Sequence, residues 1–262
     1  MREFEPAVPR KRFGQHFLID TYVIDRIIDL IALSPSDHVL EIGPGEGVLT
    51  ALLIASGAQV EAVEIDRDLA ARLRARFAHA SNFRLHCLDI LKFNLDDLAS
   101  PAGGWKVVGN LPYNISTPLI MRLLEHTGTF SSLTLMVQRE VAERMAAAAG
   151  SKTYGRLSIM VQRRCQIDAA LHIGPDSFRP PPKVDSTIVV LRPHVAVLDE
   201  GFEAWLGELV RMAFSTRRKT LANALRALAD SGAFARAGID SGLRAEQLAV
   251  ADFVRLAAAT RR

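Results

Sequence analysis

The chain reads Glu41-Ile42-Gly43-Pro44-Gly45-Glu46-Gly47 at the end of a short apolar run, and helical periodicity begins directly afterwards. We predict a strand over residues 39–42, then a turn, then a helix. Glycines in such a turn let backbone amides approach a ligand at the start of the helix. The stretch therefore predicts an α/β fold that holds a ligand at the end of its first strand.

The same alternation of strand and helix continues along the chain. We predict further strands at residues 59–65, 83–88, 105–108, 133–137 and 187–191. This alternation is typical of a mostly parallel sheet with helices on both faces and ligands beyond the carboxyl ends of the strands. From residue 200 onward the pattern is that of amphipathic helices. We therefore expect two domains, an α/β domain over residues 1–193 and a small helical domain over residues 194–262.

The composition limits the class of protein. The chain has 262 residues, of which 49% are hydrophobic, enough for one sizeable core and a small second one. Its apolar runs are far shorter than the roughly 18 residues of a membrane span, and no signal-peptide core begins the chain. Cys87 and Cys165 are its two cysteines, which offer no ligand set for a disulfide framework or a zinc site. We expect a soluble, cytoplasmic, monomeric protein without a metal.

The spacing of the glycines favours one class of nucleoside cofactor. Gly43, Gly45 and Gly47 give a G-x-G-x-G pattern, whereas the dinucleotide fingerprint requires a glycine where this chain has Val48. This spacing favours S-adenosylmethionine over NAD.

Two carboxylates end the next two predicted strands. Glu64 lies where a carboxylate accepts hydrogen bonds from the ribose hydroxyls of an adenosine. Asp89 lies where a carboxylate could accept a hydrogen bond from the adenine amino group. Each alone could equally be a capping or solvated residue at a strand end. The ordered set of glycine turn, Glu64 and Asp89 favours cofactor binding.

The fourth predicted strand ends in a stretch that offers hydrogen-bond acceptors and a ring, Gly109-Asn110-Leu111-Pro112-Tyr113. An adenine N6 amine is a poor nucleophile because its lone pair is delocalised into the ring. Asn110 and the Leu111 carbonyl, which the following proline holds in an extended backbone, could hold the hydrogens of such an amine. Tyr113 could stack on a base that has left its helix. The open alternative is a turn that only caps the strand.

A proline-rich segment at residues 177–186, the proline loop, offers a second ring in Phe178. Prolines stiffen the loop that presents this ring. Base–aromatic stacking is worth roughly 1–3 kcal/mol per base, so two rings could balance the cost of extruding a base. The open alternative is a phenylalanine buried in an ordinary loop.

Basic residues gather in two stretches without a carboxylate, residues 146–166 and 211–226. Because the net charge is only +3, the position of the charge is more informative than its sum. We expect these stretches to follow a phosphate backbone. The candidate RNA contacts are Arg156, Lys183 of the proline loop, Arg217, Arg218 and Lys219. A third basic element, residues 10–16, could fold over the cofactor as a lid or could be disordered.

Together these residues resemble the ribosomal RNA adenine dimethyltransferase family over nearly the whole chain. The resemblance rests on residues 11–18, 41–47, 109–116, 154–158, 178–186 and 217–220. It implies a Rossmann-like, seven-stranded, S-adenosylmethionine-dependent methyltransferase domain with a small C-terminal all-helical domain. It also implies dimethylation of the N6 amine of two adjacent adenosines in a hairpin near the 3′ end of small-subunit (16S) rRNA. The implied partner is this rRNA within a precursor 30S subunit, with a role in small-subunit biogenesis.

The resemblance further implies which residues contact the cofactor. These are His16, Leu18, Gly43, Glu64, Asp89 and Asn110, to which the glycine turn adds Gly45. Many relatives carry asparagine where this chain has His16. Histidine can also donate or accept a hydrogen bond, so the form of this contact stays open.

Three other functions stay open. One is the antibiotic-resistance branch of the same family, which acts on large-subunit rRNA, although residues 154–158 and 217–220 resemble the small-subunit type. Another is a noncatalytic ribosome assembly factor that keeps the fold, although intact Asn110 and Tyr113 argue against loss of activity. The third is an NAD-dependent oxidoreductase, which Val48 disfavours.

Overall fold

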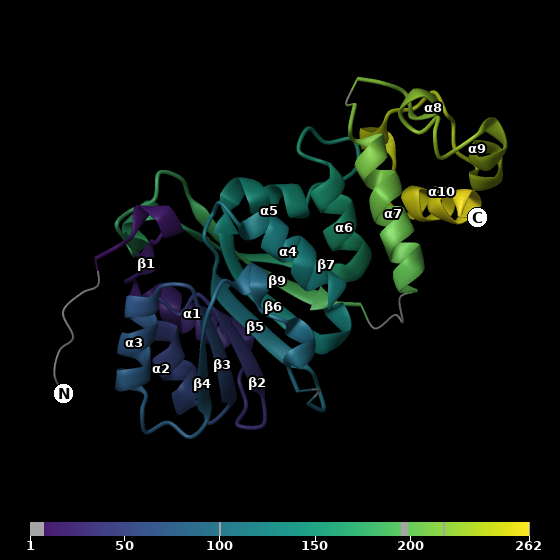
Figure 1. Ribbon diagram of the computed structural model, residues 1–262. Helices are drawn as coiled ribbons and strands as arrows, with labels where there is room; N and C mark the ends of the chain where they lie inside the picture. The colour runs from purple at the N-terminus through teal and green to yellow at the C-terminus, as the bar shows by residue number, and fades with distance from the viewer. Residues whose placement is uncertain (1–7, 100, 195–198, 217, 262) are drawn as a thin grey trace. The chain divides into compact units, whose positions relative to one another are not determined.

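The computed structural model describes residues 8–99, 101–194, 199–216 and 218–261 (Figure 1). Internal contacts divide the chain into two compact units. The sheet unit consists of the chain up to Ala142 together with Asp168–Pro193. The helical unit consists of Glu143–Ile167 together with the chain from His194 onward. The glycine turn, the turn around Asn110 and the proline loop all belong to the sheet unit.

The sheet unit alternates strands with helices. Its elements are η1 (Lys11–Phe13), β1 (Phe17–Leu18), α1 (Thr21–Ile31), β2 (His38–Ile42), α2 (Val48–Ala55), β3 (Gln59–Glu64), α3 (Arg67–Arg76), β4 (Phe83–Cys87), η2 (Ile90–Lys92), η3 (Leu95–Asp97), β5 (Trp105–Asn110), α4 (Ser116–Glu125), η4 (Thr127–Thr129), β6 (Phe130–Gln138), η5 (Pro175–Ser177), β8 (Phe178–Arg179) and β9 (Ser186–Pro193). Two more elements, α5 (Arg139–Met145) and β7 (Cys165–Ile173), run from one unit into the other.

Seven strands form one sheet in the order β4-β3-β2-β5-β6-β9-β7 (Figure 1). The strands from β4 to β6 are parallel, and β9 runs antiparallel to β6. Ile42 of β2 lies beside Val63 of β3 and Gly109 of β5, so the carboxyl ends of these strands meet at one edge. The chain order reverses between β2 and β5, which is where open α/β sheets bind ligands. The predicted seven-stranded, Rossmann-like α/β fold is confirmed.

The strand pattern in the sequence does not predict β7. This strand lies at one edge of the sheet, and only its end residues Cys165 and Ile173 are buried. Its middle includes exposed Gln166, Asp168 and His172. An edge strand with little burial does not need the β-branched, apolar run that marks the central strands.

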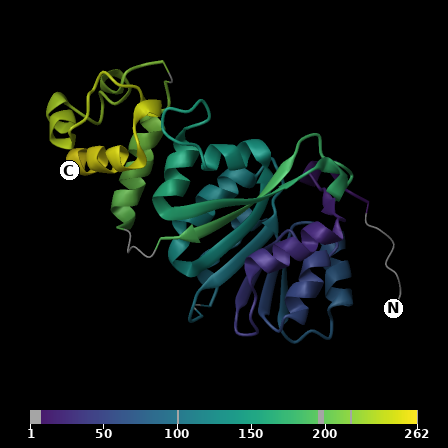
Figure 2. The same ribbon diagram turned by 180° about the vertical axis from the view of Figure 1, so that it is seen from behind.

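α1 forms a wall on one face of the sheet (Figure 2). Its buried residues are Val23, Ile24, Ile27 and Ile31. They belong to one hydrophobic cluster with a row of residues from successive strands, namely Val39, Val60, Val108, Met136 and Ile188. Asp20 begins the helix by accepting a hydrogen bond from the backbone N–H of Tyr22 at 3.0 Å. Burial of each of these α1 side chains stabilises the fold by about 1.5–3 kcal/mol. Because α1 is fixed in this way, the chain that precedes it is held at the edge of the sheet.

The helical unit is built from short helices around its own core. Its elements are α6 (Arg156–Arg164), α7 (Glu200–Ala213), α8 (Leu221–Ala224), α9 (Ser231–Ala237), η6 (Ala245–Gln247) and α10 (Val250–Thr260). From residue 199 onward, every regular element within the described residues is a helix, as predicted.

The core of the helical unit also explains why residues 143–167 belong to it. Tyr154 and Ile159 are buried in the same cluster as Leu206 of α7 and Phe253 of α10. Pro193 and His194 lie on opposite sides of a boundary between the units. The division of the chain into domains of residues 1–193 and 194–262 stays a prediction.

Candidate active site

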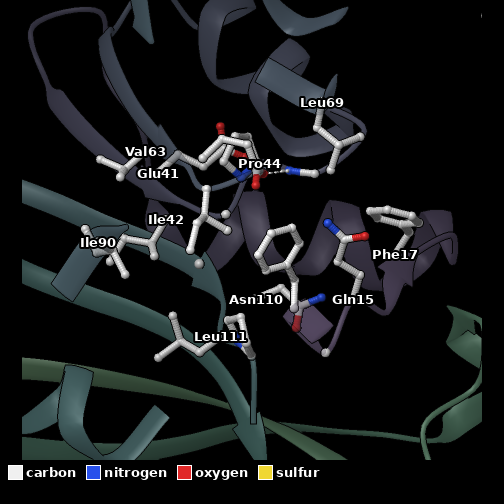
Figure 3. A pocket seen from close by; sticks show the side chains of 18 of the residues that line it. Gln15, Phe17, Glu41, Ile42, Pro44, Val63, Leu69, Ile90, Asn110 and Leu111 are labelled. Atoms are coloured by element: carbon white, nitrogen blue, oxygen red, sulfur yellow. Dashed lines mark hydrogen bonds between the residues drawn. The ribbon is translucent and has the colours of Figure 1, made fainter. Parts of the chain in front are cut away.

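A pocket lies at the carboxyl ends of β2, β3, β4 and β5 within the sheet unit. Its walls are residues 13–18, 41–49, 63–65, 69, 88–90 and 109–115, with Gly47 and Asn114 outside the lining. Gln15 and Phe17 lie across the pocket from Ile42 and Ile90 (Figure 3). The structure therefore brings together the three segments that the sequence singles out, the glycine turn, the turn around Asn110 and the N-terminal basic element.

The glycine turn requires glycine for both backbone and space. Gly43 and Gly45 have φ angles of 68° and 59°, in the left-handed region that other residues rarely adopt. A Cβ atom on Gly45 would lie 3.2 Å from the ring of Phe17. Because this face of the turn carries no side chain, a ligand can approach its backbone closely.

Glu64 ends β3 with its carboxylate buried beside the glycine turn. Its side chain accepts hydrogen bonds from the backbone N–H of Gly45 at 3.1 Å and of Asp66 at 2.8 Å. The residue is 4% exposed, and this burial raises the pKa of the carboxyl group against the opposing effect of the two amides. Each carboxylate oxygen has a further lone pair, so the group can also accept hydrogen bonds from two ligand hydroxyls.

Glu41 is a pocket residue to which the sequence alone assigns no role. It lies in β2 directly before the last residue of the strand, is 2% exposed and accepts a hydrogen bond from the Thr50 hydroxyl at 2.7 Å. Burial, opposed by this hydrogen bond and reinforced by the charge of Glu64, raises the pKa of Glu41 to about 7. The signal in the sequence is a carboxylate inside an otherwise apolar strand, directly before a glycine turn.

Asp89 lies at the end of β4 and lines the same pocket. Its side chain accepts a hydrogen bond from the backbone N–H of Leu91 at 2.9 Å and so caps η2. A capping role and a pocket position are therefore both present, and one carboxylate can serve both because it has two oxygens.

The turn after β5 forms the wall nearest the N-terminal segment. The Asn110 side chain donates a hydrogen bond to the backbone carbonyl of His16 at 2.9 Å. Leu111 is 1% exposed, and its N–H donates to the Met136 carbonyl at 3.0 Å. Pro112 also lines the pocket. The turn is thus fixed by the sheet on one side and by the N-terminal segment on the other.

Two contacts hold Tyr113, one at its hydroxyl and one on the face of its ring. Its hydroxyl lies 2.8 Å from the Ser186 hydroxyl, and its ring is stacked on the His16 imidazole with centroids 5.7 Å apart. Burial raises the pKa of the Tyr113 phenol, so this hydroxyl is a neutral hydrogen-bonding group.

Residues 10–18, which we name the strap, cross the pocket. The Arg10 guanidinium and the Gln15 amide both bind the Asp66 carboxylate, at 3.0 Å and 3.1 Å. At the other end, Phe17 and Leu18 pair as a short strand with the start of the proline loop. The strap therefore covers the pocket as the predicted lid would, and His16 and Leu18 are part of its lining.

The structure does not bring Phe178 to the pocket lining. Phe178 lies in β8 beside Leu18, is 2% exposed and belongs to the hydrophobic cluster beneath α1. Its role as a second stacking ring stays a prediction. Lys183, farther along the proline loop, is exposed.

The candidate RNA contacts of the helical unit are exposed where the structure describes them. Arg156, Arg218 and Lys219 are exposed side chains, and Arg217 lies outside the described residues. Two other arginines of the basic stretch 146–166 have an internal role, because Arg163 and Arg164 lie 2.8 Å and 3.6 Å from the buried carboxylate of Glu203. Their partner Glu203 lies in α7, far from them in the chain, so the sequence around the two arginines does not reveal this pairing.

Two kinds of feature are absent from the described residues. None of their helices is long and apolar enough to cross a membrane. No group of three or more histidine, cysteine, aspartate or glutamate side chains within the same residues could hold a metal ion.

The chain is similar to known proteins over nearly its whole length. The chain matches the family model of ribosomal RNA adenine dimethylases over residues 8–261. It is 53% identical to the ribosomal RNA small subunit methyltransferase A of Pseudomonas putida, with 95% of this chain and 93% of that protein covered. The protein of the same name from Methylococcus capsulatus is 49% identical, with 95% of this chain and 96% of that protein covered.

Two solved structures have the same fold over most of the chain. A dimethyladenosine transferase from Plasmodium falciparum aligns with a TM-score of 0.78 at 29% identity, covering 92% of this chain and 96% of that one. The 23S rRNA methyltransferase ErmE aligns with a TM-score of 0.69 at 28% identity, covering 93% of this chain and 99% of that one. Because the family model and these relatives span nearly the whole chain, the protein belongs to the ribosomal RNA adenine dimethylase family.

Proposed function

We propose that this protein uses S-adenosylmethionine to dimethylate the N6 amine of two adjacent adenosines in a hairpin near the 3′ end of small-subunit rRNA. The observation that carries the proposal is the turn around Asn110, which lies in one pocket with the glycine turn, Glu64 and Asp89. Relatives about half identical to this chain are named small-subunit rRNA methyltransferases, which supports the choice of subunit.

The residues of the pocket fit S-adenosylmethionine. Glu64 is a buried acceptor suited to the ribose hydroxyls, Asp89 suits the adenine amino group, and the turn at Gly43 and Gly45 leaves room for a closely approaching ligand. His16, Leu18 and Asn110 would complete the site from the strap and from β5. When bound, this cofactor supplies an electrophilic methyl group.

Asn110 is oriented to accept a hydrogen bond from the adenosine amine. A backbone carbonyl can only accept, so the Asn110 amide nitrogen must be the atom that faces the His16 carbonyl. Its Oδ1 is therefore the atom left to hold one N6 hydrogen, and the Leu111 carbonyl is our candidate for the other. Holding both hydrogens localises the amine lone pair on nitrogen for attack. The proton that the methylated amine then loses passes to water.

Tyr113 is our candidate stacking surface for the extruded base, because its ring lines the pocket and its hydroxyl is fixed. In a pocket of low polarity, positioning of the amine supplies much of the rate acceleration. We assign Phe178 a second, supporting position in the same substrate site, which would require the proline loop to move when RNA binds.

The proposed RNA contacts are Arg156, Lys183, Arg217, Arg218 and Lys219. Exposed cations that neutralise phosphates release counterions, so binding weakens as salt rises. Replacing Arg218 and Lys219 with alanine is expected to reduce the slope of log affinity against log salt by about one unit per lost contact. An unchanged slope would move the RNA surface elsewhere.

We further propose that the protein acts as a monomer in the cytoplasm on rRNA within a precursor small subunit, with a role in its biogenesis. The test is transfer of labelled methyl from S-adenosylmethionine to small and, in parallel, large ribosomal subunits from a strain without adenine dimethylation. Nucleoside analysis should find dimethyladenosine on small subunits alone. Label on large subunits would favour the function named for the similar structure ErmE. Binding without any label would favour a noncatalytic assembly factor.

A further inference from the structure

His16 touches each segment of the proposed substrate site. Its backbone carbonyl accepts the hydrogen bond from Asn110 at 2.9 Å, its ring is stacked on Tyr113, and its Nδ1 lies 2.7 Å from the Pro180 carbonyl. These partners come from the turn after β5 and from the proline loop. The contacts of the His16 side chain with Pro180 and Tyr113 both lie on the base-facing wall of the pocket.

The contact with Pro180 identifies one ring nitrogen of His16 that carries a hydrogen. A carbonyl oxygen only accepts hydrogen bonds, so Nδ1 carries the hydrogen and donates it. An imidazole that is anchored at Nδ1 cannot rotate about its Cβ–Cγ bond without breaking this hydrogen bond. The face it presents to Tyr113, with an angle of 23° between the two ring planes, is therefore fixed.

Tyr113 is consequently held from two directions. Ser186, which is fully buried, lies 2.8 Å from its hydroxyl, and the His16 ring covers part of one face. A phenol ring held at its tip and on its face has one orientation available. An extruded base that stacks on it then meets a preformed surface, and less ordering entropy opposes its capture.

We propose that His16 is a positioning residue for the target adenosine, because its imidazole ties Tyr113 to the proline loop and so fixes the surface on which the base stacks. This inference rests on the proposed function. It adds to the cofactor contact that the family resemblance implies for this position, since the imidazole also fixes the stacking surface for the base.

Three substitutions separate the parts of this contact. His16→Asn can place an amide N–H near the Pro180 carbonyl but has no ring. His16→Phe keeps a ring against Tyr113 but has no donor. His16→Ala removes both. Each conservative variant should recover part of what alanine loses, and His79→Asn in the exposed segment after α3 is the matched control.

The first readout is the Tyr113 ring itself, which needs no activity. The chain has three tyrosines, so ring-labelled tyrosine gives three sets of NMR signals, and Tyr113→Phe identifies one of them. In His16→Ala the Tyr113 signals should move and show faster ring flipping, while the exposed Tyr22 signals stay in place. Unchanged Tyr113 signals would overturn the inference.

The second readout is catalysis on unmethylated small subunits. Loss of one neutral hydrogen bond and a ring contact should lower kcat about 3- to 10-fold in His16→Ala. The Kd of S-adenosylhomocysteine, measured by calorimetry, gives the part of the effect that belongs to the cofactor contact, and kcat is measured at saturating S-adenosylmethionine so that this part does not enter it. A weakened cofactor Kd with unchanged kcat overturns the inference, as does a parent-like kcat. A parent protein that labels no subunit overturns the proposed function instead, while the NMR result still decides the contact with Tyr113.

Discussion

The two sides of the pocket are assembled in different ways. On the glycine-turn side, Glu64 meets Gly45 across 19 residues of sequence, and Glu41 meets Thr50 across 9. On the strap side, Asn110 meets His16 across 94 residues, and His16 meets Pro180 across 164. The first side is made by one strand–turn–helix unit and its neighbour, whereas the second exists only when distant segments have packed. We therefore expect changes on the first side to act on stability and changes on the second to act on binding and turnover.

Asn110→Ala tests the residue that belongs to both sides, because it ends a central strand and its side chain holds the strap. The substitution removes the acceptor proposed for the N6 amine. By analogy with loss of one polarising group at a transition state, methyl transfer should fall roughly 10²- to 10³-fold. Single-turnover labelling of small subunits measures this rate, and RNA affinity should change little.

Asn114→Ala is the matched control for this substitution, since Asn114 is an exposed neighbour outside the pocket lining. It should keep nearly the parent rate. Equal activity of Asn110→Ala and the parent would remove the proposed role of the amide. A large loss of RNA affinity instead would mean that Asn110 acts by holding the strap.

Glu41→Gln tests the glycine-turn side through the pH dependence of stability. The folded-state pKa of Glu41 is raised from 4.5 to about 7. Below about pH 4.5 both states hold the proton, so its stabilising contribution is complete. As the pH rises toward 7, the unfolded chain loses this proton before the folded protein does. The free energy of unfolding therefore falls by about 3 kcal/mol. Glutamine does not titrate and should lack this loss.

The measurement is the free energy of unfolding of Glu41→Gln and of the parent between about pH 4 and pH 8. The difference, variant minus parent, should rise by about 3 kcal/mol over this range. A difference that does not depend on pH would show that the pKa of Glu41 is the same in the folded and unfolded states.

Much of the glycine-turn side was predictable from the sequence because its signals are local. Gly43 and Gly45 follow a strand-forming run, and Glu64 and Asp89 end the next two strands, so the order of the chain already places them at one edge of a parallel sheet. The six strands predicted from β-branched runs are present in the sheet. The raised pKa of Glu41 was not predictable, because it depends on burial that only the packed structure supplies.

The strap side was predictable in its parts but not in its connections. The sequence points to Asn110, Tyr113 and the proline loop, yet nothing local indicates that His16 joins them. The same reason applies to Arg163 and Arg164, whose partner Glu203 lies on another helix. Contacts between residues this far apart in the chain are decided by the tertiary fold.

Gly47→Ala sharpens the comparison by changing only the scaffold of the glycine turn. Gly47 has a φ angle of 77°, and a Cβ atom there would lie 2.6 Å from the buried Leu73 side chain. Left-handed backbone strain and this overlap together should cost about 2–3 kcal/mol of unfolding free energy. Gly103→Ala is the matched control, since φ is 96° there and nothing lies within 4 Å of the added atom.

Chemical denaturation of both variants measures the effect, and Gly103→Ala should lose only about 1 kcal/mol from backbone strain. Equal losses in the two variants would mean that the turn and α3 relax around the added methyl group. The packing around the glycine turn would then rearrange more easily than the burial of Glu41 and Glu64 suggests.

Arg10→Ala should have the smallest effect, because it loosens one attachment of the strap and leaves the pocket walls intact. Arg10 bonds Asp66 at 3.0 Å and also Asp68, and its backbone N–H donates to Gln15 at 2.7 Å. The Arg10 side chain is 36% exposed, so solvent screens the pair, which is worth about 0.2–1 kcal/mol. S-adenosylhomocysteine should therefore dissociate about two- to five-fold faster from the variant, and added salt should narrow the difference.

Stopped-flow displacement measures this release rate, and Arg26→Ala is the matched control because it removes a similar exposed arginine paired with Asp29 on α1. The control should release the ligand at the parent rate. Faster release from Arg10→Ala alone would mean that the strap opens before the ligand leaves. Equal rates for all three proteins at low salt would place the barrier to release on the glycine-turn side, where the proposed hydrogen bonds between the ligand and Glu64 would have to break.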